Sequence, residues 1–212
     1  MSAICNPYFD EATSKIKYGR LGETHVDLEV YDYSSGSREP INRRDALTAK
    51  YCWSVPTPEL IEVFASAGPV VSVGSGTGYL ESLLVQAGAD VIATDAFLGE
   101  RNTYSHREQW MEVTEMDCAE AAARWADRAL LISWPPYNRP MGSSALESYL
   151  EAGGHTVLYL GEGWGGCTGD ERFHELLWEN FEETRKIMLP QWYGLRDYGS
   201  IHRKLPCLRS EL

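Results

Sequence analysis

The sequence predicts an α/β domain in which a mostly parallel sheet is covered by helices on both faces. From residue 57 onward, short apolar segments of strand length alternate with longer segments whose apolar residues recur at helical spacing. Several short segments, such as VVSV at 70–73, are almost wholly apolar, which is typical of strands buried on both sides. The last two strand-like segments have no helix between them, so we expect an antiparallel pair at the edge of the sheet.

The predicted elements follow in order along the chain. The first helix of the alternation lies within 57–68, and Gly68 follows its last turn. Thr57 is its expected N-cap, and Pro58 occupies the first helical position; Asp170 is the expected N-cap of the last helix. Beyond it we expect strands at 69–74, 90–95, 111–117, 128–134, 155–163, 182–190 and 197–205, and helices at 78–89, 118–127, 143–154 and 170–181.

Residues 1–55 differ from the rest because they are polar, rich in aromatic residues and weakly periodic. We expect a short helix within 6–19, an extended segment at 25–33 and a helix at 42–53. We therefore divide the chain into an N-terminal lead-in or cap at 1–55 and a main domain at 56–212.

Composition and charge narrow the class of protein. The formal net charge is −12, and no stretch is strongly basic, which argues against a long nucleic-acid partner. No apolar run reaches the roughly 18 residues of a membrane span, and the N-terminus lacks the pattern of a secretory signal, so we expect a cytoplasmic protein. The five cysteines include no CxxC pair, and the histidines show no ligand spacing, so we expect no metal.

A glycine-rich turn follows the first strand of the alternation. Gly74, Gly76 and Gly78 form the pattern GxGxG, where glycine permits a tight turn and a close approach to a ligand. A phosphate loop ending in GK[ST] is excluded, because Tyr79 and Leu80 follow. The dinucleotide pattern GxGxxG requires a small residue where Tyr79 stands, and a bulky ring there would meet a pyrophosphate, which argues against a nicotinamide cofactor.

An acidic residue, Asp95, ends the second strand of the alternation. A carboxylate at this place can accept hydrogen bonds from both hydroxyls of a ribose. It is compatible with a dinucleotide or with an S-adenosyl ligand, and equally with a turn or helix cap.

The segment VVSVGSGTGYLESLLVQAGADVIATD (70–95) resembles the first two motifs of the class I S-adenosylmethionine-dependent methyltransferases. The resemblance spans roughly residues 57–205, and it extends to a small subgroup with YxWxVP before the glycine turn and WPPY and GEGxGGCTGD after it. It implies a Rossmann-like seven-stranded sheet with an antiparallel C-terminal strand pair. It also implies S-adenosylmethionine as cofactor and S-adenosylhomocysteine as product. The cofactor contacts that we expect are Gly74, Ser75, Gly76, Gly78, Tyr79, Asp95, Ala96, Asp117, Ser133 and Trp53.

The segment LLISWPPYN ends the fourth strand of the alternation, beside the expected methyl position. In methyltransferases acting on amino groups, an Asp, Asn or Ser precedes Pro-Pro-Tyr and, with a proline-fixed carbonyl, holds the N–H groups of the acceptor. Pro135, Pro136 and Tyr137 match this motif, but Trp134 offers only an N–H donor, and strand alternation would turn Ser133 to the other face. We expect Trp134 to wall the site or to stack on the acceptor or the sulfonium; a structural Pro-Pro turn is the alternative.

Two further segments face the same crevice in this prediction. The glycine-rich loop at 159–170 carries Glu162, which could accept a substrate proton or bind a cation, or be a solvated turn residue. Before the first helix of the alternation, Tyr51 and Trp53 could close over the cofactor or pack in the core. Arg43 and Arg44 could meet a carboxylate, although a solvated helix face is the simpler interpretation.

The sequence therefore favours methyl transfer to nitrogen or another heteroatom of a small molecule or peptide by in-line displacement, with Trp134, Pro135, Pro136, Tyr137 and Glu162 as the catalytic candidates. Such a reaction needs alignment and desolvation rather than a covalent nucleophile. Three alternatives stay open: methylation of a nucleic-acid base, non-catalytic binding of S-adenosylmethionine, and a nicotinamide oxidoreductase. The oligomeric state is not predicted.

Overall fold

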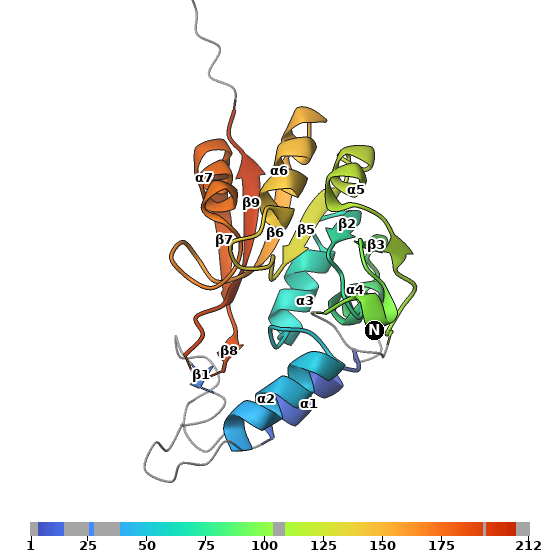
Figure 1. Cartoon of the computed structure of the whole chain (residues 1–212), viewed down its shortest axis with the longest axis vertical. Helices are drawn as coiled ribbons and strands as arrows, with labels where there is room; N and C mark the ends of the chain where they lie inside the picture. Colours follow the sequence, from blue (N-terminus) through green and yellow to red (C-terminus); the bar gives the residue numbers. More distant parts are fainter. Residues whose placement is uncertain (1–3, 15–25, 28–38, 104–108, 193, 207–212) are drawn as a thin grey trace, which may run out of the picture.

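The computed structural model describes residues 4–14, 26–27, 39–103, 109–192 and 194–206. Its centre is a seven-stranded sheet with the order β4-β3-β2-β5-β6-β9-β7 (Figure 1). The strands are β2 (Val70–Val73), β3 (Val91–Asp95), β4 (Thr114–Glu115), β5 (Ala129–Ser133), β6 (Thr156–Gly161), β7 (Phe181–Met188) and β9 (Tyr198–Lys204). This order confirms the predicted Rossmann-like sheet.

The C-terminal strand pair is antiparallel, as predicted. Strand β9 lies between β6 and β7 and runs antiparallel to both, while β2, β3, β4, β5 and β6 pair in parallel. The short connection from β7 to β9 leaves no length for a parallel crossover. The segment contains one short strand, β8 (Pro190–Gln191), which pairs with β1 (Val26–Asp27) outside the main sheet.

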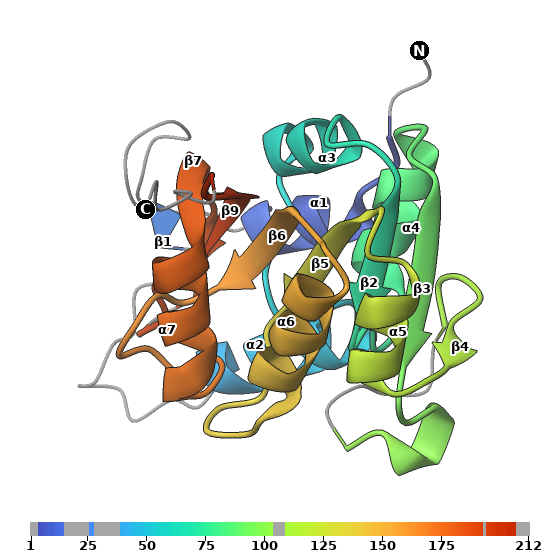
Figure 2. The ribbon, with the colours of Figure 1, turned by 90° about the horizontal axis from the view of Figure 1, so that it is seen from above.

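Helices cover both faces of the sheet (Figure 2). One face carries α5 (Cys118–Arg124), α6 (Met141–Glu151) and α7 (Glu171–Asn180), and the other carries α3 (Pro58–Ala65) and α4 (Tyr79–Gln86). The helices α1 (Pro7–Thr13) and α2 (Glu39–Lys50) lie past the ends of the strands, below α3 in Figure 1. A hydrophobic core lies on each face of the sheet, and side chains of β2 contribute to both. Val70 packs on the side of α3 and α4, while Val71 and Val73 pack on the side of α5 and α6.

Helix caps are formed as the sequence predicts. The Thr57 hydroxyl accepts the amide of Leu60 at 3.1 Å, and the Asp170 carboxylate accepts the amide of Phe173 at 3.1 Å. The expected third strand is shorter than predicted, because only Thr114–Glu115 pairs with β3 and both residues are exposed at the sheet edge.

The lead-in shares a core with the main domain. Tyr8 of α1 is fully buried, stacks on Tyr51 with ring centroids 5.0 Å apart, and contacts the ring of Tyr79 edge-on. The predicted extended segment at 25–33 is a strand at Val26–Asp27, and the remainder of it lies outside the described residues.

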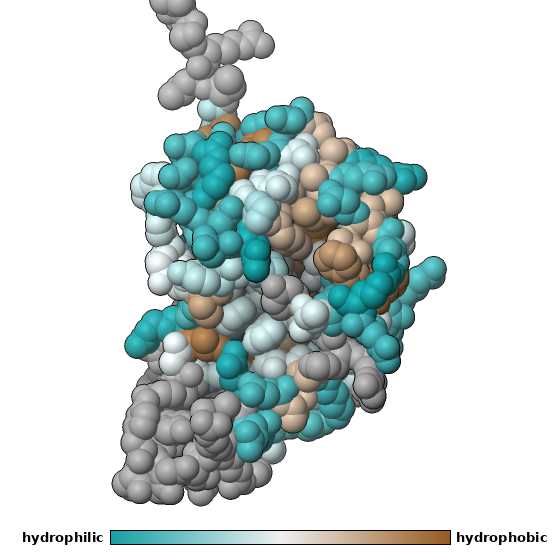
Figure 3. All heavy atoms as spheres, viewed as in Figure 1, coloured by the Kyte–Doolittle hydropathy of each residue, from teal (hydrophilic) through white to brown (hydrophobic). Residues whose placement is uncertain are grey.

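The face of the molecule in Figure 3 is mostly hydrophilic, with apolar residues gathered in a few places. Across the described part of the chain, no helix combines the length and apolar character that a membrane crossing requires.

Candidate functional site

The main cavity has a volume of about 460 Å³ and lies at the carboxyl ends of β2, β3 and β5. Ligands of open parallel sheets bind in this place. Four segments supply most of the cavity lining: the glycine turn after β2, the end of β3 with the residues that follow it, the WPPY segment after β5, and the second half of α2 with the loop beyond it.

Three glycines give the turn after β2 its shape. Gly74, Gly76 and Gly78 have φ of 68°, 57° and 71°, the left-handed region that favours glycine. A side chain at Gly74 would also collide with the Met141 side chain. The turn therefore presents bare backbone to the cavity.

The Asp95 carboxylate lies beneath this turn and lines the cavity beside Ala96. One oxygen accepts the Gly76 amide at 2.9 Å and the Asn102 side-chain amide at 3.2 Å, and the other accepts the Phe97 amide at 2.9 Å. Because a carboxylate offers about four acceptor sites, one site remains for an incoming hydroxyl, and a second hydroxyl must displace an existing donor.

The Tyr79 ring does not face the turn, contrary to the sequence prediction. It is buried in the core, where its hydroxyl accepts the Tyr8 amide at 3.1 Å and donates to Asn6 at 2.8 Å. Packing against the aromatic rings of Tyr8 and Tyr51 stabilises this position. Ring bulk at Tyr79 is therefore no obstacle to a ligand at the turn, and Tyr79 does not line the cavity.

Trp134 stands directly after β5 in a left-handed conformation, with φ of 48°. This break in the strand geometry brings both Ser133 and Trp134 to the cavity wall, whereas strict alternation predicts opposite faces. The Trp134 ring stacks on Trp53, with centroids 5.5 Å apart and planes at 24°. The two indoles form one wall of the cavity.

A hydrogen-bonded relay holds the Trp134 ring in place. Its Nε1 donates to the Ser54 hydroxyl at 2.5 Å, and that hydroxyl donates to the Asp197 carboxylate at 2.6 Å. Ser54 and Asp197 are buried. The pKa of Asp197 is raised to about 6, chiefly by burial and also by the charge of Glu162, against the opposing effects of the hydrogen bond from Ser54 and the charge of Arg44.

The Pro-Pro turn is joined to the glycine-rich loop after β6. The Pro135 carbonyl accepts the Gly169 amide at 2.8 Å, and Pro136 and Thr168 form a short antiparallel bridge. Pro135 and Pro136 line the cavity, and the ring of Tyr137 is 67% exposed at its mouth. The carbonyl that an acceptor amine would use is thus already bonded within the protein.

Glu162 lies in a separate groove, which Tyr137 and Cys167 also line. Its carboxylate accepts the Arg196 amide at 2.6 Å and the Cys167 amide at 2.8 Å. Burial raises the pKa of Glu162, but the hydrogen bonds from Cys167 and Arg196 outweigh it, so the pKa lies below its ordinary value. Glu162 ties the loop together and is a weak proton acceptor.

Asp117 is exposed and caps α5, where its carboxylate accepts the amides of Ala119 and Glu120 at 2.9 and 3.3 Å. Its neighbour Cys118 lines the cavity, while Asp117 does not.

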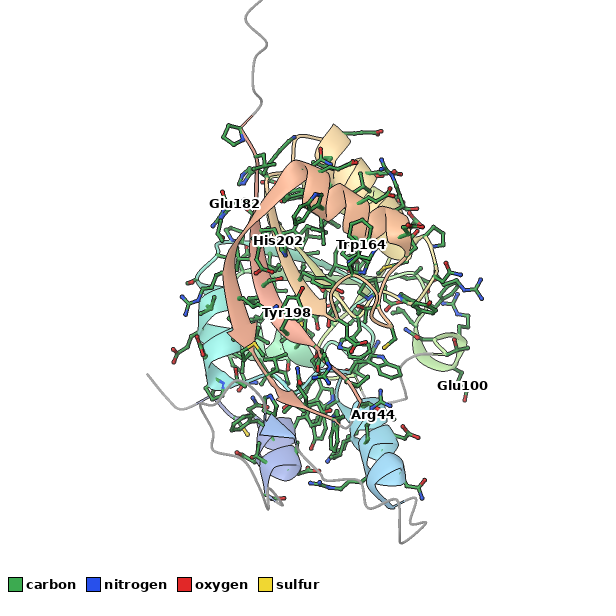
Figure 4. The ribbon with its side chains drawn as sticks, turned by 90° about the vertical axis from the view of Figure 1, so that its left-hand side faces the viewer. Arg44, Glu100, Trp164, Glu182, Tyr198 and His202 are labelled. Atoms are coloured by element: carbon green, nitrogen blue, oxygen red, sulfur yellow. The ribbon has the colours of Figure 1, made fainter. Side chains whose placement is uncertain are left out.

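Sequence reasoning missed two residues of the site. Ser54 and Asp197 are separated by 143 positions, and no local pattern connects them. For Arg44 the sequence left two interpretations, contact with a carboxylate or the simpler solvated helix face; in the structure it lines the cavity and places its guanidinium carbon 5.6 Å from the centre of the Trp53 ring. Figure 4 shows Arg44 where α2 meets the rest of the domain. Its neighbour Arg43 instead donates to the Glu11 carbonyl at 2.6 Å.

No protein-family model matches the chain, and a search of curated proteins found no match. Solved structures with a similar fold include magnesium protoporphyrin IX methyltransferase from Synechocystis PCC 6803 with bound SAM, at 13% identity and a TM-score of 0.46 over 97% of this chain and 100% of that chain. A SAM dependent methyltransferase from Archaeoglobus fulgidus has 15% identity and a TM-score of 0.48 over 82% of this chain and 100% of that chain. Burkholderia thailandensis 1,6-didemethyltoxoflavin-N1-methyltransferase has 16% identity and a TM-score of 0.45 over 86% of this chain and 94% of that chain. The function proposed below therefore depends on this chain's own residues.

Proposed function

We propose that this protein is a methyltransferase that uses S-adenosylmethionine to methylate a heteroatom of a small acceptor. The observation that carries the proposal is a single cavity in which bare glycine backbone and the Asp95 carboxylate lie at one end and the Trp53–Trp134 wall at the other. The first end suits a ribose and its nucleoside. The second end suits a flat or cationic group, because indole faces attract both.

The residues present fit this cofactor. The backbone of the glycine turn and the Asp95 carboxylate would hold the nucleoside, with Ala96 beside it, and Ser133 and Trp53 line the path toward the acceptor. When bound, the cofactor supplies a methyl group activated on a sulfonium. The chain would need to align the lone pair of the acceptor with that methyl group and leave the acceptor a path to release its proton to water, and no residue would need to form a covalent bond.

The chain's contribution is alignment and exclusion of water. The Trp53–Trp134 wall is fixed by the relay through Ser54 and Asp197, so it does not need to reorganise when the acceptor arrives. An apolar wall beside the reacting atoms strengthens electrostatic interactions there.

The geometry disfavours the amino group of a nucleic-acid base as acceptor. Two hydrogen-bond acceptors would have to hold its N–H bonds. Trp134 supplies only a donor, which is bonded to Ser54, and the Pro135 carbonyl already accepts the Gly169 amide with one of its two lone pairs. A cavity of about 460 Å³ lies toward the small end of the usual range for ligand sites of roughly 300–1,000 Å³. We therefore favour a small molecule, or one side chain of a peptide.

Calorimetric titration with S-adenosylmethionine, S-adenosylhomocysteine and NAD tests the proposal. We expect both sulfur compounds to bind and NAD to bind at least about ten-fold more weakly, a difference of roughly 1.4 kcal/mol. Tight binding of NAD with no binding of either sulfur compound would refute the proposed function. If the sulfur compounds bind, transfer from methyl-labelled cofactor to a small-molecule mixture then separates an enzyme from a non-catalytic binding protein.

A further inference from the structure

The accessible charges of the cavity are positive in a chain of net charge −12. The charged residues that line it are Arg44, Glu81, Asp95 and Arg139. Glu81 is buried and accepts a hydrogen bond from Ser72 at 2.6 Å, and Asp95 already accepts three. The remaining acceptor site of Asp95 is assigned to the ribose in the proposed function, so the two arginines remain for the acceptor molecule.

Arg44 has an unsatisfied donor. Its Nε is buried and has no hydrogen-bond partner within the described part of the chain. The carboxylate recorded beside it belongs to Asp45, at 4.0 Å, on a side chain that is 64% exposed. A buried donor left without a partner destabilises the protein. The Arg44 side chain as a whole is 26% exposed and lines the cavity, so a ligand can reach the guanidinium beside this atom.

Arg139 lies two residues after Tyr137, is exposed, and also lines the cavity. None of the ion pairs recorded among the described residues includes Arg139. Its guanidinium is therefore available at the mouth of the cavity, on the side of the WPPY segment.

The electrostatic neighbours of Arg44 place it away from the glycine turn. Burial raises the pKa of the Cys167 thiol to about 11 and that of Asp197 to about 6, and the Arg44 charge opposes both shifts. Cys167 follows β6 and Asp197 precedes β9, so Arg44 belongs to the side of the cavity beyond Trp134.

From this arrangement we infer that the acceptor is a flat aromatic molecule that carries a carboxylate, which Arg44 and Arg139 bind. The inference rests on the proposed function, since it names the acceptor of the same site. Arg44 stacks over Trp53, which stacks on Trp134, so the site offers planar surfaces and a planar guanidinium side by side. A guanidinium held in one plane matches the two oxygens of a carboxylate.

The test compares 4-hydroxybenzoate with its neutral counterpart 4-hydroxybenzamide in calorimetric titrations, both with S-adenosylhomocysteine present and without it. We expect the carboxylate to bind at least about ten-fold more tightly than the amide. Arg44→Gln should weaken carboxylate binding about ten-fold and leave amide binding unchanged. Arg172→Gln, on α7 and outside the cavity lining, is the matched control and should change neither affinity.

Four results would overturn the inference. They are equal binding of carboxylate and amide, no binding of the carboxylate at its solubility limit, an unchanged carboxylate affinity in Arg44→Gln, and competition by inorganic phosphate as strong as that by the carboxylate. A fifth result would also overturn it: if Arg44→Gln weakens binding of S-adenosylhomocysteine but not of 5′-methylthioadenosine, which lacks a carboxylate, then Arg44 binds the cofactor's own carboxylate. Failure of wild-type protein to bind S-adenosylhomocysteine is a separate outcome and counts against the proposed function.

Discussion

The two halves of the cavity are built in different ways. The glycine-turn half, residues 74–78 with Asp95, is formed by backbone geometry and short-range bonds, and each Asp95 oxygen has a donor. The tryptophan half (Trp53, Ser54, Trp134 and Asp197) joins distant segments through one stack and two hydrogen bonds. The comparison shows that short-range bonds shape one half and long-range contacts the other, while each half keeps one buried side-chain oxygen without a hydrogen-bond partner among the described residues, Ser75 Oγ and Asp197 Oδ1.

The conformation of the tryptophan half also lowers the stability of the folded protein. A non-glycine residue in the left-handed region, such as Trp134 with φ of 48°, costs on the order of 1–3 kcal/mol. Asp197 adds a buried carboxylate oxygen with no hydrogen-bond partner among the described residues. Proteins tolerate such costs mainly where function requires them, so the predictions below test whether the two halves differ in this way.

The largest expected effect concerns Asp197 and sharpens the comparison. Burial raises its pKa from 3.8 in the ordinary case to about 6. Between these values the folded protein keeps a proton that the unfolded chain has lost, so this group's contribution to stability falls as pH rises through about 6. About two pKa units correspond to about 3 kcal/mol. Asp197→Asn has no carboxyl proton to lose. Its free energy of unfolding should therefore rise relative to that of wild type by up to about 3 kcal/mol between about pH 4 and pH 8.

Urea unfolding of both proteins across this pH range measures the effect. The difference between variant and wild type isolates Asp197 from His202, whose pKa burial lowers to about 4, so that its contribution to stability is lost as pH falls below about 6.5. Asp127→Asn, at an exposed aspartate before β5, is the control and should track wild type. A difference that stays constant with pH would show that Asp197 ionises in the folded protein as it does in the unfolded chain.

The second effect separates the two halves by function. Trp134→Ala removes the stack on Trp53 and the donor to Ser54, so an acceptor loses its wall. We expect turnover to fall about 100-fold, because misalignment of this kind can have such an effect, while the affinity for S-adenosylhomocysteine stays within about three-fold. Trp134→Phe keeps a ring without the N–H and should recover part of the turnover. If both variants lose cofactor affinity and keep their turnover, Trp134 belongs to the glycine-turn half.

The sequence predicted the turn and the place of Asp95 because their causes are local, whereas it misplaced the Tyr79 ring, whose position depends on packing against Tyr8 and Tyr51. Left-handed glycines at alternate positions and an acid at a strand end are visible in a few consecutive residues, and the strand and helix periods place them at one edge of the sheet. The same holds for the caps at Thr57 and Asp170.

The tryptophan half was not predictable because it depends on long-range packing. Ser54 meets Trp134 across 80 positions and Asp197 across 143, and strand alternation fails where Trp134 leaves the β region. Glu162 shows the converse error. Its place at a strand end suggested a role in the site, but loop amides take both of its oxygens.

The third effect lies in the glycine-turn half. Asp95→Ala removes the carboxylate that we assign to the ribose, together with its bonds to the turn and to Asn102. We expect the affinity for S-adenosylhomocysteine to fall about ten-fold or more, the loss of a charge-assisted hydrogen bond. Calorimetry gives the value, and binding of 4-hydroxybenzoate without cofactor should be unaffected. Unchanged cofactor affinity would place the ribose elsewhere, and the glycine-turn half would then not be the part of the cavity that binds the cofactor.

The smallest effect lies at the boundary between the halves and the neighbouring groove. Tyr137 is 67% exposed and lines both the main cavity and the groove of Glu162, so its ring can cover one edge of an acceptor but cannot enclose it. Removing one partner of an aromatic contact costs about 1 kcal/mol, so Tyr137→Ala should lower kcat/KM about five-fold. Tyr137→Phe should behave like wild type, because the proposed contact with the acceptor depends on the ring and not on its hydroxyl group. A larger loss in S-adenosylhomocysteine affinity than in kcat/KM would mean that the ring covers the cofactor, and the acceptor would then reach the methyl group from the side of Arg139 alone.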